Sequence, residues 1–116
     1  MTILRKNLIS NSNGVTYGTG SDTYGRYYWI KYGNGLLEQG GIITSNIPTE
    51  FTYNFPLQFS IVFQILTTTY GSNGNGATVR NVLSFTETSF RTWGQWGANG
   101  SNTWKFSWRA IGIPKN

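Results

Sequence analysis

The chain has 116 residues and a mass of 13.0 kDa, a length that suits one domain with a modest hydrophobic core. Aromatic residues make up 16% of the sequence and charged residues 11%, a composition too apolar for a disordered segment. The formal net charge is +5, but the basic residues are scattered without a basic stripe, so we expect no nucleic-acid partner.

Residues 1–23 are polar and rich in glycine, and we expect them to form a connector. The folded body is predicted to span residues 24–116, where apolar residues alternate with the period of strands. The predicted strands cover residues 28–32, 36–43, 51–55, 59–66 with an extension to 70, 79–86, 90–93, and 104–110 with an extension to 113. About seven short strands and no helix of ordinary length indicate an all-β fold, a small antiparallel β-sandwich.

Glycines lie between the first two of these strands and also inside the second. Gly33-Asn34-Gly35 predicts a hairpin turn, because asparagine and glycine tolerate a positive φ. Gly40-Gly41 lies inside the second strand and predicts either a bulge or a close approach of another backbone.

Three later strands have apolar faces that indicate where the core lies. Phe51, Tyr53 and Phe55 share one face of the first. The next strand is predicted to be apolar on both faces. One face carries Phe59, Ile61, Phe63 and Ile65, and the other carries Val62 and Leu66. That strand therefore needs a cover on both sides, from a second sheet or another subunit. The last strand is predicted to line the core with Trp104, Phe106, Trp108 and Ala110.

Two loops rich in glycine and asparagine, residues 71–76 and 94–102, adjoin the candidate binding residues. A flat aromatic ring packs on the apolar face of a sugar while neighbouring amides bond its hydroxyls. We therefore expect a receptor or glycan site at Trp93, Gln95, Trp96 and Asn99, with a second group at Tyr70, Asn73 and Asn75. Alternatively, the tryptophans plug the end of the sandwich or a subunit interface, and the first loop is a plain hairpin end.

Residues suited to catalysis or metal binding are scarce. Cysteine and histidine are absent, which removes the thiolate nucleophile, the commonest general base and the commonest metal ligand. An enzyme would depend on four carboxylates, and nothing in the sequence brings Glu38 and Glu87 together. We expect no enzyme activity, no metal and no cofactor. The sequence has neither a signal peptide nor an apolar run of the roughly 20 residues that span a bilayer, so we expect a soluble protein without membrane insertion.

Three segments share a pattern with a known family. Tyr32 to Gly41 reads YGNGLLEQGG, Phe55 to Phe59 reads FPLQF, and Trp108 to Gly112 reads WRAIG. They resemble, in the same order, the NG-apolar-apolar-x-Q-(W/G)-G hairpin, the FP-x-x-F element and the W-x-AIG strand of tail-fibre tip domains. Such domains are found in tailed bacteriophages and related prophage or tailocin particles.

The resemblance implies a C-terminal receptor-binding domain at the tip of a tail fibre. It implies a homotrimer, joined to the remainder of the fibre through residues 1–23. It further implies a place on a virion or phage-derived particle, exposed to the extracellular medium, and attachment to a bacterial surface. The partner there would be a glycan, lipopolysaccharide included, or an outer-membrane protein. The host, the receptor and the kind of particle stay open.

Two other functions compete with receptor binding. The chain is alternatively a stand-alone carbohydrate-binding domain like the H-type lectins, which are similar in outline. It is alternatively a structural module that only trimerises or caps a fibre. A trimer in solution favours a fibre tip, whereas a monomer favours the lectin-like domain.

Overall fold

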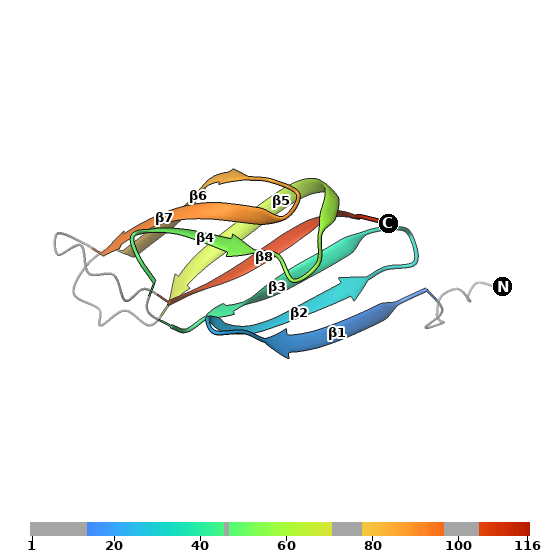
Figure 1. Cartoon of the computed structure of the whole chain (residues 1–116), viewed down its shortest axis with the longest axis horizontal. Helices are drawn as coiled ribbons and strands as arrows, with labels where there is room; N and C mark the ends of the chain where they lie inside the picture. Colours follow the sequence, from blue (N-terminus) through green and yellow to red (C-terminus); the bar gives the residue numbers. More distant parts are fainter. Residues whose placement is uncertain (1–13, 46, 71–77, 97–104) are drawn as a thin grey trace.

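The computed structural model describes residues 14–45, 47–70, 78–96 and 105–116 (Figure 1). Within these residues there are eight strands and no helix. The strands are β1 (Thr16–Ser21), β2 (Gly25–Lys31), β3 (Leu37–Ile43), β4 (Glu50–Asn54), β5 (Phe59–Tyr70), β6 (Thr78–Phe85), β7 (Ser89–Trp96) and β8 (Lys105–Pro114).

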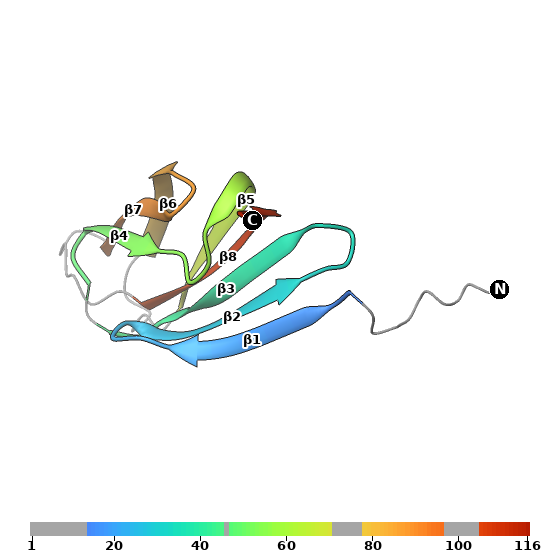
Figure 2. The same ribbon diagram turned by 45° about the vertical axis from the view of Figure 1, so that its right-hand side comes forward.

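The strands form two sheets that face each other (Figures 1 and 2). The larger sheet has the order β1-β2-β3-β8-β5, the smaller has β4-β7-β6, and all pairs are antiparallel. Between them lies a core rich in aromatic rings. Trp108 of the larger sheet is 5.3 Å from Tyr53 and 5.4 Å from Phe90 of the smaller sheet, measured between ring centroids. The predicted antiparallel β-sandwich is confirmed.

Two of the predicted apolar faces are confirmed. Phe51, Tyr53 and Phe55 are buried, while the residues between them are exposed. On β8, the buried side chains are those of Phe106, Trp108 and Ala110. Trp104, predicted to belong with them, lies outside the described residues.

Strand β5 departs from the predicted alternation. Its pairing with β8 shifts register between Phe59 and Ile61 and again between Val62 and Gln64. Each shift is a bulge, which changes the face that later side chains occupy. Phe59 is buried as predicted, but Ile61 and Phe63 are exposed, so the prediction that these residues share one face is wrong.

Strand β1 was not predicted, because residues 1–23 were expected to be a connector. Thr16–Ser21 instead forms an edge strand of the larger sheet, paired with Arg26 to Lys31 of β2. A β-carbon on Gly18 would lie 2.6 Å from the Trp29 ring, so the glycine leaves room for this ring to lie against β1. The connector prediction is therefore wrong for Thr16–Ser21, and residues 1–13 lie outside the described part.

Two predictions about glycines, a hairpin turn before β3 and a close backbone approach within it, are confirmed. Gly35 has a φ of 95°, and its N–H donates to the carbonyl of Tyr32 at 3.0 Å, which closes the predicted hairpin turn. At Gly40 the register continues without a bulge on either side. A β-carbon there would lie 2.9 Å from the Trp108 carbonyl oxygen, so the close approach, one of the two alternatives, is confirmed.

A buried glutamine ties the larger sheet to the segment that leads into β5. Gln39 is completely buried; its Nε2 donates to the Leu57 carbonyl and its Oε1 accepts from the Leu57 N–H, both at 2.8 Å. This pair of bonds satisfies both backbone groups of one residue outside the sheets. Gln39 therefore fixes where the chain turns from the smaller sheet back into the larger one.

Candidate functional site

The structure places part of the predicted binding site on strand β7. Trp93, Gln95 and Trp96 belong to this strand, so residues 94–96, which were expected to begin a loop, are part of β7. Gln95 and Trp96 are opposite Val79 and Thr78 in the backbone register. Asn99, the fourth residue of this predicted group, lies outside the described residues.

The second predicted group is placed only at its base. Tyr70 is the last residue of β5 and is opposite Lys105 in the register with β8. Asn73 and Asn75 lie outside the described residues, so this group stays a prediction.

Trp93 points away from the core. Its neighbours along β7, Thr92 and Gly94, are buried, and alternation places the half-buried Trp93 on the outer face of the smaller sheet. It therefore does not plug the sandwich, as one alternative proposed. The register places Glu50 of β4 on one side of Trp93 and Asn81 of β6 on the other.

A second row of polar side chains runs beside Trp93 on the same face. Arg91 pairs with Thr52 on one side and Ser84 on the other in the register. Its guanidinium forms an ion pair with Glu50, and its Nε is 3.4 Å from the Ser84 hydroxyl. We call this outer surface the Trp93 face; it comprises Glu50, Thr52, Asn81, Ser84, Arg91 and Trp93.

The chemistry of the Trp93 face suits a polyhydroxylated ligand. An aromatic ring lies among an amide, a carboxylate, a guanidinium and hydroxyls, which together offer donors and acceptors. Sequence reasoning found Trp93 but missed Glu50, Asn81 and Arg91, since Glu50 and Asn81 come from other strands. Arg91 was detectable in principle, because it is two residues from Trp93 in a strand.

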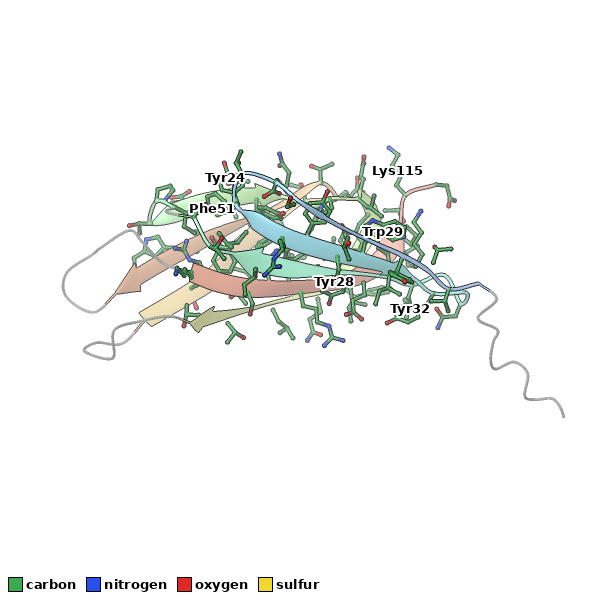
Figure 3. The ribbon with its side chains drawn as sticks, turned by 90° about the horizontal axis from the view of Figure 1, so that it is seen from below. Tyr24, Tyr28, Trp29, Tyr32, Phe51 and Lys115 are labelled. Atoms are coloured by element: carbon green, nitrogen blue, oxygen red, sulfur yellow. The ribbon has the colours of Figure 1, made fainter. Side chains whose placement is uncertain are left out.

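The outer face of the larger sheet carries a hydrogen-bonded cluster around Glu38. The Tyr28 hydroxyl donates to Oε2 of Glu38 at 2.5 Å and the Tyr32 hydroxyl to Oε1 at 3.2 Å, from β2 and the hairpin after it (Figure 3). Arg109 of β8 forms an ion pair with the same carboxylate, Nε to Oε2, at 3.3 Å. Burial, together with the hydrogen bond to Glu38 and its charge, raises the pKa of Tyr28 to about 12.

A groove lies beside this cluster, with a volume of about 570 Å³. Its lining comes from four neighbouring strands of the larger sheet, β2, β3, β8 and β5, and includes Arg26 and Arg109. This volume falls in the range of small-ligand sites.

A third surface is apolar and lies where the two sheets adjoin. Strands β5 and β6 are the terminal strands of their sheets. They are held together by a bond from the Thr67 hydroxyl to the Arg80 carbonyl at 2.7 Å, and the Phe59 N–H donates to the Glu87 carbonyl at 2.9 Å. Leu66 is 50% exposed but lines the groove, whereas four other large apolar side chains between these bonds are 47–58% exposed: Ile61, Phe63, Leu83 and Phe85. We call these four the β5–β6 strip.

In the described part of the chain, no group of three or more acidic residues could hold a metal ion. No helix there is long and apolar enough to cross a membrane.

Comparison with known proteins identifies the family. A family model described as tail fibre protein gp53-like, C-terminal, matches residues 31–113, well over half of the chain. The chain belongs to this family. It is thus a tail-fibre domain, as the three sequence segments indicated, and a component of a phage tail or of a related particle.

Solved structures of pyocin tail fibres share the fold of the tail-fibre domain. A Pseudomonas aeruginosa R1 pyocin fibre matches with a TM-score of 0.60 and 16% identity, over 86% of this chain and 29% of that chain. An N-truncated R2-type pyocin tail fibre has a TM-score of 0.58 and 16% identity, over 87% and 39% of the two chains. An N-truncated R1-type pyocin tail fibre has a TM-score of 0.59 and 17% identity, over 86% and 88%. The domain therefore spans a minor part of two of these chains and most of the third. No curated protein sequence matches it.

Proposed function

We propose that the tail-fibre domain is a receptor-binding module that attaches its particle to a bacterial surface, and that the Trp93 face contacts a surface glycan. One observation carries the proposal: a tryptophan on a rigid three-stranded sheet points outward among polar side chains from all three strands. The cross-strand register holds these groups, so little conformational entropy is lost on binding. Trp93 supplies the stacking surface, and Asn81, Glu50 and Arg91 supply the polar contacts.

The module binds its receptor without catalysis. Three of the four carboxylates in the sequence have structural partners. Asp22 accepts from the Tyr53 hydroxyl at 2.8 Å, Glu38 is held by the tyrosine cluster, and Glu50 pairs with Arg91. Each of these three carboxylates is thus engaged in holding another side chain in place, which is a structural role.

Replacing Trp93 by alanine is expected to weaken binding to receptor-bearing cells by about thirtyfold per site, or about 2 kcal/mol, as for other interface tryptophans. The thermal unfolding midpoint should stay within a few degrees of the original, because Trp93 lies outside the core. Binding of the labelled domain to a panel of bacterial strains measures the first quantity, and circular dichroism measures the second.

Tyr17→Ala is the matched control, since Tyr17 is an aromatic residue that is 75% exposed on β1 in the other sheet. Its binding should equal that of the unmodified domain. Periodate oxidation of the cells should abolish binding and protease treatment should not; the reverse pattern indicates a protein receptor. A folded Trp93→Ala domain that binds like the original excludes the Trp93 face.

We further propose that the domain is a homotrimer whose copies meet through the β5–β6 strip. Exposed apolar side chains that gather on neighbouring strands mark interaction sites in soluble proteins, and terminal strands offer unpaired backbone groups. Strand β5 has no charged residue and the one in β6, Arg80, is buried. Copies that each carry a charge of +5 can therefore approach through this strip without placing like charges together. Three receptor sites on one fibre then gain avidity from one another.

Changing Phe63 and Leu83 together to glutamate is expected to convert the trimer to a monomer, because buried like charges would oppose assembly. Light scattering coupled to size exclusion should give three times 13.0 kDa for the original domain and 13.0 kDa for the variant. The Tyr17→Glu variant, which is changed at the opposite edge of the larger sheet from β5, should remain trimeric. A trimeric double variant would exclude the strip as the interface. A monomeric original domain would instead favour the stand-alone lectin-like module.

A further inference from the structure

We propose that the groove on the outer face of the larger sheet is a second binding site, separate from the Trp93 face, and that it takes an acidic sugar. By acidic sugar we mean a saccharide unit that bears a carboxylate or a phosphate. This inference rests on the proposed function to the extent that such sugars are components of bacterial surfaces. The groove itself is argued from its own residues.

Two rows of side chains cross the sheet at the groove. The cross-strand register gives the first row as Arg26, Ile42, Ser107 and Thr68, and the second as Tyr28, Gly40, Arg109 and Leu66. Gly40 leaves a gap in the second row, and the Tyr28 ring lies over it: a β-carbon at Gly40 would be 2.6 Å from Cε1 of this ring. The groove thus combines a ring and two aliphatic side chains with two hydroxyls and two guanidinium groups.

The Glu38 cluster fixes the groove wall before any ligand arrives. Tyr28 is held by its bond to Glu38, and the same carboxylate orients the Arg109 guanidinium through Nε. The Arg109 side chain is 53% exposed even so, which leaves much of it accessible to a ligand. Burial and Glu38 raise the pKa of Tyr28 above its ordinary value, so its hydroxyl remains a donor to Glu38 well above neutral pH. A wall that is already ordered lowers the entropic cost of binding.

The charge of the groove selects an anion. None of the described residues that line it is acidic, and two are arginines. Arg26 is exposed and makes no ion pair within the part of the chain that the structure describes. Arginine donates in pairs to carboxylate and phosphate groups, which suits both acidic sugar types.

The position of the groove favours a sugar over a peptide. It lies across β3 and β8, whose backbone groups are already paired with strands on both sides. An extended peptide binds a sheet by adding a strand at an edge, and no edge is available at the centre of this groove. A sugar ring needs no backbone partner: its apolar face can contact Tyr28 and Leu66 while hydroxyls meet Ser107 and Thr68.

The test is a titration of the purified, isotopically labelled domain, followed by the amide resonances of Ile42 and Ser107. Glucuronate and glucose 6-phosphate are the two acidic probes, and glucose is the neutral one. Saturable shifts are expected with at least one acidic probe and none with glucose. Comparing the acidic probes shows whether carboxylate or phosphate is preferred. Arg26→Gln should weaken the acidic probe about tenfold, through loss of a charge-assisted contact.

Lys115→Gln is the matched control, because it removes the same charge from an exposed position outside the groove. It should leave the affinity unchanged. The inference is overturned if no probe causes saturable shifts of the two amide resonances. That result is expected if another copy of the chain covers the groove. The inference is equally overturned if glucose binds as well as the acidic probes, if inorganic phosphate alone does, or if both variants weaken binding equally. Trp93→Ala should titrate like the original domain, so failure of the Trp93 face and failure of the groove are separate results.

Discussion

Changing Gly112 to alanine is expected to lower the free energy of unfolding by about 4 kcal/mol, or to prevent folding altogether. Gly112 lies in β8 between Leu37 of β3 and Val62 of β5, and Val62 lies between the two bulges of β5. A β-carbon there would overlap the carbonyl oxygen of Ile61, and it would lie 2.9 Å from Cδ1 of the buried Phe59. Backbone on a paired strand cannot yield as the end of a flexible side chain can, so β5 and β8 would have to separate. Urea unfolding at fixed protein concentration measures the loss.

Ser60→Thr provides the comparison for this variant. It also adds one methyl group, but to an exposed side chain on the neighbouring strand β5. Its unfolding free energy should stay within about 0.5 kcal/mol of the original. If Gly112→Ala were equally mild, the close approach of the two backbones could not be what requires glycine at this position.

Changing Gln39 to leucine is expected to cost about 3 kcal/mol of stability, even though the two side chains are of similar size. The leucine would fill the buried space but leave the Leu57 N–H and carbonyl without the partners they have at 2.8 Å. For a domain of this length the loss corresponds to a fall of about 12 °C in the melting temperature. Differential scanning calorimetry measures it.

The same substitution at an exposed glutamine isolates the role of the two bonds. Gln64 lies in β5 with its side chain exposed, and Gln64→Leu should change stability by no more than about 0.5 kcal/mol. Equal stability of the two variants would show that Gln39 is retained for a reason other than its bonds to Leu57.

These two positions give a physical meaning to the sequence segments that resemble tail-fibre tips. Gln39 of the first segment forms hydrogen bonds with Leu57 in the middle of the second segment. It is also paired, between β3 and β8, with Ala110 of the third segment. The glycine that closes the third segment admits the β5 backbone. The segments therefore describe how three separate parts of the sandwich interlock.

Period-two patterns predicted the fold well where a strand is regular. They placed the buried aromatics of β4 and β8 correctly, because alternation there is unbroken. They failed on β5, because a bulge is a property of the pairing between strands and has no mark in the sequence of one strand. They missed β1 because its glycines read as a linker, whereas their role is to admit the rings of Trp29 and Tyr27.

The candidate site was predictable only in part. Trp93 was identified from its residue type, but its neighbours Glu50 and Asn81 meet it through the order β4-β7-β6, which no local pattern reveals. The groove was likewise beyond the sequence, because Arg26 and Arg109 come from strands that are not adjacent in the chain. Lys105 and Arg109 alternate with the buried aromatic residues of β8, and both are exposed.

The antiparallel ladder between β1 and β2 determines how the domain responds to mechanical load. Six consecutive residue pairs join these strands, and β1 is the first strand of the described chain (Figure 1). A pull applied at Thr16 along the strand loads all of these hydrogen bonds in shear. Shear requires the bonds to break together, whereas a pull across the strands would open them one after another. The strand that resembled a linker in the sequence is thus joined to the sheet in a geometry that resists tension along β1.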